Sequence, residues 1–406
     1  MQKRFTPDAG GVFPEWEEVT LGDIAEFSRG KGLTKKDVSE KGERKCLLYG
    51  QLQVRYGTII KNVTGMTDVE LKNPVLSKSG DVLISGTISA GLAKASCIKE
   101  DGVIIGGDIN ILRPKEGIDG EFLARAINAN TKKFKRFLEG SVILHLKNEN
   151  IKEVSIRIPK SIEEQRKIAA ALAAYDEMIA VKTAKLETWQ ECKKRMVKEI
   201  FGRTKRFKDD DGREFPEWEE KTLGEISEPL KYGMSAAAVK YDGENKYLRI
   251  TDIDEASRKY VSDKIASPEA SKIAEKFLVQ KNDLLFARTG ASVGKTYLYD
   301  ETDGKMYYAG YLIKAHIKPE YDSQFIFQLT LTNEFKKWVK KESMRTAQPG
   351  INAECLAKYK MMIPCMEEQQ KIGSFLVEID KEIQIQKEFV KTYAEGKKRM
   401  MRELVA

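Results

Sequence analysis

Two long stretches of this chain repeat apolar residues at alternating intervals of four and three. The first runs from Ile168 to Ile200 and the second from Ile372 to Leu404. A period of 3.5 residues held for about five heptads predicts a coiled coil rather than a helix lying on a globular core. Polar residues interrupt the pattern at matching places, for example Lys193 and Lys397. Such interruptions are typical of positions that fix the register of a helix–helix seam.

The region before each stretch has a different pattern, with strands first and a helix after them. Runs of β-branched and aromatic residues bounded by Gly, Asp and Asn are typical of strands, and an amphipathic run is typical of a helix. The predicted strands are Leu47–Val54, Val82–Ile88 and Val103–Leu112 in the first region, and Tyr247–Thr251, Leu284–Arg288 and Met306–Ile317 in the second. The predicted helices are Glu121–Leu138 and Ser323–Lys341.

The two halves of the chain are copies of one unit. The matching segments are Arg4–Phe5 and Arg206–Phe207, FPEWEEVTLGDI (Phe13–Ile24) and FPEWEEKTLGEI (Phe215–Ile226), and PKSIEEQRKI (Pro159–Ile168) and PCMEEQQKI (Pro364–Ile372). A duplicated chain that folds on itself acquires a pseudo-two-fold axis, as in a symmetric dimer. Near-identical segments must meet the same environment twice, such as each other and two copies of one partner. Dissimilar segments can each bind something different.

These patterns predict an α+β protein, with two pseudo-two-fold-related mixed α/β recognition domains joined by two long helices packed as an antiparallel coiled coil. The predicted divisions are a first domain at 1–158, a long helix at 159–201, a charged linker at 202–214, a second domain at 215–362 and a second long helix at 363–406. Ser161 and Glu164 fit a capping box at the start of the first long helix. The acidic pairs Glu163–Glu164 and Glu367–Glu368 suit the positive end of a helix dipole better than acid–base chemistry.

Composition changes this picture only slightly. The chain has 406 residues, a net charge of +8 and 33% charged residues, which fits a globular protein with a polyanionic partner. Its five cysteines and two histidines are scattered, so the sequence predicts no metal site. No apolar stretch approaches the ~20 residues of a membrane span, and we expect a cytoplasmic protein without a membrane partner.

Several segments resemble catalytic motifs but lack their chemistry. Gly290–Thr296 (GASVGKT) has three residues between its glycines where a phosphate-binding loop has four. Gly106–Leu112 (GGDINIL) is not GxGxxG and is predicted to be a turn into a strand. The motifs of an amino-methyltransferase are absent, and two lone histidines give little support to a catalytic triad. The sequence therefore predicts a binding protein without catalytic residues and without a cofactor of its own.

Polar and basic side chains recur at matching places in both units, near the strand ends and before each long helix. Such side chains can bond base edges in the major groove, while the Lys clusters 132–136 and 336–341 suit DNA phosphates. For each residue a solvated surface position is an equally good explanation. The candidates for DNA contact are Tyr49, Gln51, Gln53, Arg55, Ser85, Thr87, Ser89, His145, Lys147 and Asn148 in the first unit, and Arg249, Thr251, Arg288, Thr289, Ser292, Lys295, Gln348 and Asn352 in the second.

In combination, these segments resemble the specificity subunit of type I restriction–modification systems. The resemblance covers nearly the whole chain and depends on the doubled FPEWEE-x-TLG-[DE]-I segment, on GDVLI (Gly80–Ile84) and NDLLFARTG (Asn282–Gly290), on QPGINAECL (Gln348–Leu356) and on the two IP…EEQ-x-KI helix starts. One departure is GTISAG (Gly86–Gly91), which lacks the Arg-x-Gly of the second unit, so a DNA role of Arg288 cannot be transferred to the first unit.

The resemblance implies a function for each part of the chain. Each recognition domain would bind one half of a bipartite site in double-stranded DNA, and the coiled coil would set the spacing. Two methyltransferase subunits carrying S-adenosylmethionine would dock on the helices and flip an adenine for N6-methylation. Two restriction subunits using ATP and Mg²⁺ would complete the endonuclease, whereas this subunit would be non-catalytic.

Two other interpretations remain. A coiled-coil scaffold without DNA binding explains the helices and the repeat but not two dissimilar domains with basic and amide-rich faces. A self-sufficient nucleotide-dependent enzyme is disfavoured by the defective loop at Gly290. Salt-dependent binding to duplex DNA distinguishes the scaffold from the specificity subunit.

Overall fold

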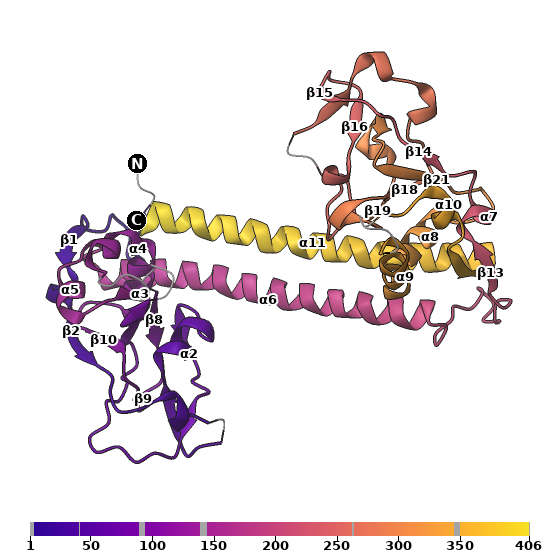
Figure 1. The fold of residues 1–406 in the computed structure, drawn as a ribbon. Coiled ribbons are helices and arrows are strands. Elements are labelled where there is room, and N and C mark those ends of the chain that lie inside the picture. Colours follow the sequence, from indigo (N-terminus) through magenta and orange to yellow (C-terminus); the bar gives the residue numbers. More distant parts are fainter. Residues whose placement is uncertain are drawn as a thin grey trace. The chain divides into compact units, whose positions relative to one another are not determined.

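The computed structural model describes residues 4–39, 41–88, 94–138, 144–261, 264–344 and 350–405. Its contacts divide the chain into two compact units, residues 1–183 with 388–406 and residues 184–387 (Figure 1). The two long helices are α6 (Ile162–Phe201) and α11 (Met366–Leu404). Each unit therefore contains part of both helices.

The first unit is built on a five-stranded mixed sheet in the order β2-β10-β6-β8-β4. Smaller sheets with the orders β5-β3-β9, β1-β12 and β11-β7 surround it. The strands are β1 (Glu17–Thr20), β2 (Ala25–Arg29), β3 (Arg44–Leu47), β4 (Ile59–Ile60), β5 (Met66–Thr67), β6 (Val82–Ser85), β7 (Thr87–Ile88), β8 (Ala95–Ile98), β9 (Ile104–Ile105), β10 (Ile109–Pro114), β11 (Leu144–His145) and β12 (Ser155–Ile158). The short helices are α1 (Leu21–Ile24), α2 (Tyr49–Val54), α3 (Gly120–Ala129), α4 (Thr131–Phe134) and α5 (Asn148–Lys152).

The second unit follows the same plan with a four-stranded sheet in the order β14-β21-β18-β19. Its remaining strands pair as β13-β22, β15-β17 and β16-β20. The strands are β13 (Glu219–Thr222), β14 (Lys231–Tyr232), β15 (Ala238–Lys240), β16 (Lys246–Leu248), β17 (Ala266–Pro268), β18 (Asp283–Ala287), β19 (Thr296–Leu298), β20 (Met306–Tyr308), β21 (Leu312–His316) and β22 (Lys360–Ile363). The short helices are α7 (Leu223–Ile226), α8 (Ser323–Thr330), α9 (Asn333–Ser343) and α10 (Ala353–Ala357).

The core of each unit joins the sheet to both long helices. In the first unit, Ile168 and Leu172 of α6 are buried with Phe122 of α3 and with Leu404, at the end of α11. In the second unit, the start of α11 and the end of α6 occupy the corresponding core. Burial of large apolar side chains contributes about 1.5–3 kcal/mol each, so the long helices are part of the domain cores.

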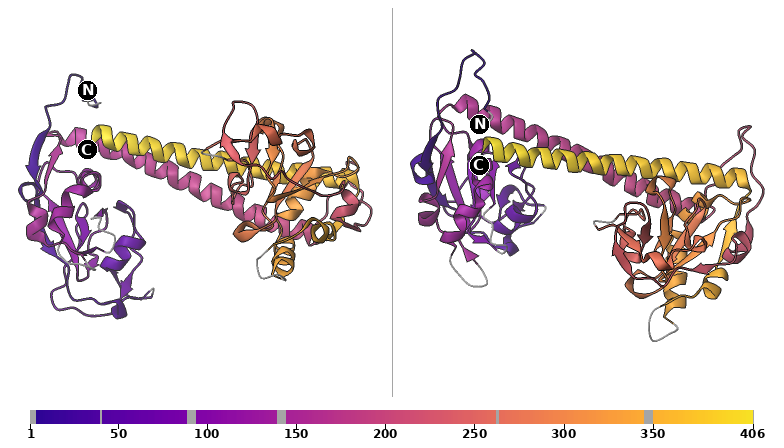
Figure 2. Two further views of the ribbon diagram at one scale, coloured as in Figure 1. Left: turned by 45° about the horizontal axis from the view of Figure 1, so that its top comes forward. Right: turned by 90° about the horizontal axis from the view of Figure 1, so that it is seen from above.

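Within each unit α6 and α11 lie side by side and antiparallel (Figures 1 and 2). Asp176 contacts Lys397 in the first unit, and Lys193 contacts Asp380 at 2.7 Å in the second. These are the same two positions of the repeat, with the roles of the helices exchanged. The predicted antiparallel helix pair is confirmed, and the two polar seam positions Lys193 and Lys397 are ion-paired across it.

The repeated sequence motif forms one buried cluster in each unit. Arg4 donates to the fully buried carboxylate of Glu164 at 3.0 and 2.8 Å, and the Trp16 indole donates to it at 3.3 Å. The hydrogen bond to Glu164 raises the pKa of Arg4. In the second unit, Arg206 and Trp218 bind Glu368 in the same way.

This cluster explains why the motif occurs twice. Gln165 extends it by accepting from the Asp119 N–H at 2.8 Å and donating to the Pro159 carbonyl at 2.9 Å. The EEQ segment thus meets the same environment twice inside its own units. For the buried Glu and Gln of each segment, two copies of an external partner are not needed to explain the identity.

Most predicted strands and helices exist, but their bounds shift by a few residues and several predicted strands are divided into two. The predicted helices at 121–138 and 323–341 are each broken, into α3 and α4 and into α8 and α9. Gly106–Leu112 is, as predicted, a turn leading into a strand, with β10 starting at Ile109. One prediction is wrong, because Tyr49–Val54 is the helix α2 rather than the continuation of a strand.

Candidate nucleic-acid interface

At the end of β6 and β18 the two units share one backbone arrangement, which we call the junction. In the first unit the Gly86 N–H donates to the Asp108 carbonyl at 2.7 Å, and the Leu146 N–H donates to the Gly86 carbonyl at 2.8 Å. In the second unit the Arg288 N–H donates to the Tyr311 carbonyl at 3.0 Å, and the Ile351 N–H donates to the Arg288 carbonyl at 2.8 Å. The shared bonds make Gly86 equivalent to Arg288, and Asp108 equivalent to Tyr311.

A third pair of positions follows from the sheet register. Arg29 lies opposite Asn110 in the first unit, and Tyr232 lies opposite Ile313 in the second. Since these partners are two residues beyond Asp108 and Tyr311, Arg29 is equivalent to Tyr232. Each junction therefore presents three side-chain positions on the same backbone frame.

The first-unit junction carries a cation and an acceptor. Arg29, half-exposed, donates to the Asp108 carboxylate at 2.6 Å, and the Thr87 hydroxyl donates to the other carboxylate oxygen. The exposed His145 lies opposite Thr87 in the β7–β11 pair. Asn148, at the start of α5, donates to the Ser28 carbonyl at 3.0 Å.

The second-unit junction carries aromatic rings and a cation. The Arg288 guanidinium lies over the Tyr232 ring, 4.8 Å from its centroid. The Tyr232 hydroxyl accepts from the Ala353 N–H at 2.9 Å, so the ring is held both at its face and at its hydroxyl. Tyr311 is 65% exposed. A planar, aromatic-backed guanidinium is well suited to bidentate contact with a guanine edge.

Of the predicted residues, the structure brings three together at each junction. Thr87, His145 and Asn148 meet in the first unit. In the second, Thr289 bridges to Gly350 beside Arg288. Asn352 follows Ile351 and caps α10 by accepting from the Cys355 N–H at 2.7 Å. The neighbouring Lys147 is exposed at the start of α5.

Other residues predicted to contact DNA are buried or are bound by groups of the chain itself. Ser85 is 2% exposed and donates to the Thr87 carbonyl at 2.6 Å. Lys295 is 8% exposed, and its ammonium donates to the Ile253 carbonyl at 2.9 Å. Arg249 makes a bidentate pair with Asp252 at 2.8 and 2.7 Å, a bond that raises the pKa of Arg249.

The remaining predicted residues lie outside the junctions or outside the described residues. Tyr49 and Arg55 are exposed on and after α2, while Gln51 accepts from the Leu48 N–H at 3.0 Å and caps that helix. Thr251 is exposed, and Ser292 is in the loop after Arg288. Ser89, Gln348 and the side chain of Gln53 lie outside the described residues.

Sequence reasoning missed four junction residues, namely Arg29, Asp108, Tyr232 and Tyr311. They come from strand ends and turns far from Gly86 and Arg288 in the chain, and only the sheet register brings them together. The duplication gave only a partial signal, because the 202-residue offset of the FPEWEE segments places Arg29 at Lys231, and one inserted residue is needed to match Arg29 with Tyr232 and Asp108 with Tyr311.

The described parts of the chain show no metal centre, no membrane span and no phosphate-binding loop of the nucleotide-binding type. Within them, no group of three or more His, Cys, Asp or Glu residues is placed to hold a metal ion. Among the helices described, none combines the length and apolarity needed to cross a membrane. Gly290–Thr296 leads into the strand β19, not into the helix that follows a phosphate-binding loop.

The fold and the two junctions define a protein with two units that share a backbone frame and differ in surface chemistry. The family model for the type I restriction modification DNA specificity domain matches residues 14–188 and again residues 216–391. The chain therefore belongs to the family of type I restriction–modification specificity subunits.

Individual relatives agree with this assignment. The chain is 23% identical over 414 residues to the type I restriction enzyme MjaVIII specificity subunit of Methanocaldococcus jannaschii, covering 96% of this chain and 92% of that protein. It is 27% identical over 236 residues to the MjaIX specificity subunit of the same organism, covering 54% and 53%. The crystal structure of the type I restriction–modification S subunit from M. genitalium has the same fold, with a TM-score of 0.66, 15% identity and 96% of each chain covered.

Proposed function

We propose that this specificity subunit reads a bipartite DNA sequence, with one half-site bound by each unit through its junction. The observation that supports the proposal is that equivalent backbone positions carry different side chains in the two units. Arg29, Gly86 and Asp108 in one unit stand where Tyr232, Arg288 and Tyr311 stand in the other. Two different sets of hydrogen-bonding groups on equivalent frames are suited to two different base sequences.

The partners and cofactors belong to the same proposal. Two methyltransferase subunits dock on α6 and α11 and supply S-adenosylmethionine and the adenine-N6 chemistry. Two restriction subunits supply the ATP- and Mg²⁺-dependent cleavage. Exposed apolar side chains on the long helices, including Met178, Val181 and Ile385, offer surface for such docking. In this arrangement the chain itself selects the site and carries out no reaction.

The test is to express the chain with its methyltransferase subunits in cells that lack other adenine methylation and to map N6-methyladenine genome-wide. We expect one asymmetric motif with two specific parts separated by a spacer of fixed length. An omission control lacking this chain should leave the genome unmethylated at that motif. Methylation with no motif, or with a single continuous one, would refute the proposal.

A coiled-coil scaffold without sequence-specific binding is the competing function. It requires no particular side chains at the junctions, so Arg288→Ala and Arg29→Ala would leave any methylation pattern unchanged. A specificity subunit requires that the two variants affect different halves of the motif.

A further inference from the structure

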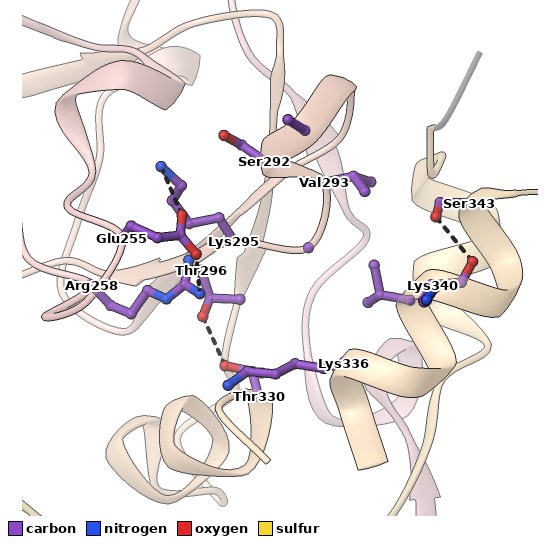
Figure 3. A pocket seen from close by; sticks show the side chains of 13 residues that line it. Glu255, Arg258, Ser292, Val293, Lys295, Thr296, Thr330, Lys336, Lys340 and Ser343 are labelled. Atoms are coloured by element: carbon purple, nitrogen blue, oxygen red, sulfur yellow. Dashed lines mark hydrogen bonds and ion pairs between the residues drawn. The ribbon is translucent and has the colours of Figure 1, made fainter. Parts of the chain in front are cut away.

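The second unit contains a basic cavity that the junction does not use. It has a volume of about 360 Å³ and lies between the loop 291–296 and one face of α9 (Figure 3). Its charged lining residues are Arg258, Lys295, Lys336, Lys340 and Glu255. Four cations against one carboxylate give this cavity a formal charge of +3. Hydroxyl groups of Ser292, Thr296, Thr330 and Ser343 complete the polar lining.

The cations divide into those that build the cavity and those left for a ligand. Lys295 is buried, and its ammonium is bound to the Ile253 carbonyl at 2.9 Å and lies 3.4 Å from the Glu255 carboxylate. Arg258 donates an N–H of its Nη2 to the Glu255 carboxylate at 2.9 Å. Its Nη1, however, is buried and has no hydrogen-bond partner among the described residues. A buried donor without an acceptor is unfavourable, and an incoming anion would supply the missing acceptor.

Lys336 and Lys340 add two positively charged ammonium groups to the same cavity. They are exposed, one turn apart on α9, and both line the cavity (Figure 3). In the parts of the chain that the structure describes, neither forms an ion pair with an acidic side chain. Two unneutralised ammonium groups beside an unsatisfied guanidinium nitrogen favour a compact oxyanion with several acceptor oxygens.

We infer that this cavity binds a phosphate group. The favoured source of the phosphate is the DNA backbone, and this part of the inference rests on the proposed function. The loop that lines the cavity directly follows Arg288 and Thr289 in the chain. A base contact by Arg288 would place the adjoining DNA backbone near this loop. Phosphate contacts of this kind position a protein on the duplex without reading the sequence. A free phosphate or nucleotide has the same chemistry and is the other possible source.

The DNA arm of the test uses the full chain in complex with its methyltransferase subunits. For the Lys336→Ala/Lys340→Ala variant we expect a slope of log K against log[salt] that is shallower by about 1–2. Affinity should fall by a similar factor for the native site and for unrelated duplexes. The matched control is Lys337→Ala/Lys341→Ala, which removes the same charge from the same helix at residues outside the cavity lining and should keep most of the slope.

The second arm titrates inorganic phosphate and ATP into the full chain by calorimetry, without DNA. If phosphate or ATP binds the wild type and the control but not Lys336→Ala/Lys340→Ala, the cavity is assigned to a free ligand. If both arms give the same result for the variant and the control, the inference is wrong. If the wild-type complex shows no sequence preference at all, the proposed function fails while the phosphate titration still decides the cavity.

Discussion

At the scale of single residues, Arg288 is the side chain best prepared to read a base. Stacking on Tyr232 at 4.8 Å fixes the plane of the guanidinium before DNA binds. If Arg288 makes a bidentate contact with guanine, Arg288→Ala should cost about 1–3 kcal/mol at one base pair. The measurement is competition binding with duplexes varied one position at a time, in both half-sites.

Arg288→Lys is the informative companion variant. It keeps the charge but loses the planar fork, so we expect overall affinity to be retained better than base preference. If Arg288→Ala and the wild type discriminate equally at every position, Arg288 does not read a base.

Another residue-scale prediction concerns the buried Arg–Glu–Trp cluster of each unit. Glu164→Gln leaves Arg4 without its buried anion and should destabilise the first unit by about 3 kcal/mol, because breaking a buried ion pair strands the remaining charge. Hydrogen exchange of amides in residues 4–30 and 155–175 measures this locally, which avoids assuming two-state unfolding of the whole chain.

Glu163→Gln is the matched control for this variant. Glu163 accepts from the Asp8 N–H at 3.0 Å on the surface, so Glu163→Gln should change local stability far less than Glu164→Gln. Equal effects of the two substitutions would show that the buried pair does not hold the unit together.

The sequence could identify which segments carry polar groups but not which way those groups point. Ser85 is the last residue of β6 and Arg288 directly follows β18, yet Ser85 is buried and Arg288 is on the junction. Lys295 is a residue type that often contacts DNA, but two backbone carbonyls and Glu255 already surround its ammonium. Inward and outward directions depend on sheet register and on contacts between distant segments, which a local pattern does not contain.

At the scale of elements, the long helices were predictable and α2 was not. A 3.5-residue period over a whole helix averages out local exceptions, so the seam was visible in spite of Lys193 and Gln386. In Tyr49–Val54, aromatic and β-branched residues favoured a strand, but Gln51 accepts from the Leu48 N–H and Leu52 is buried in the core. Short segments take their structure from such contacts rather than from propensity.

The seam ion pairs give the element-scale prediction. Lys193 and Asp380 are partly buried at 2.7 Å, and Gln328 also donates to Asp380 at 2.9 Å. Lys193→Ala or Asp380→Ala should each lower stability by about 1–2 kcal/mol, with a coupling energy above about 0.5 kcal/mol in the double-mutant cycle. Thermal unfolding of the wild type, the two single variants and the double variant provides the measurement.

The pair Lys397 and Asp176 in the first unit is an internal replicate of the same experiment. If the pairs fix register, the charge-reversed double variant Lys193→Asp/Asp380→Lys should recover most of the stability lost in either single reversal. Simple additivity in both cycles would mean that the pairs are solvated surface charges.

At the scale of the whole molecule, each long helix has residues in both units, and each unit buries part of both helices. Their ends are anchored in separate cores, at Leu172 and Leu404 in one unit and at Ile200 and Leu376 in the other. A change in the length of the helices between these anchors therefore affects both units. The proposed bipartite site makes that change measurable on DNA.

Inserting one heptad into both helices, after Thr183 in α6 and after Lys387 in α11, preserves the 3.5-residue period. Seven residues at 1.5 Å per residue add about 10 Å, or roughly 3 bp of duplex. We therefore expect the methylated motif to keep both specific parts while its spacer lengthens by about 3 bp, as mapped by genome-wide N6-methyladenine sequencing. A heptad in α6 alone separates Asp176 from Lys193 without separating their partners Lys397 and Asp380, so this control should lose methylation rather than shift the spacer. A doubly inserted variant that methylates the original spacer would show that the helices do not set the distance between half-sites.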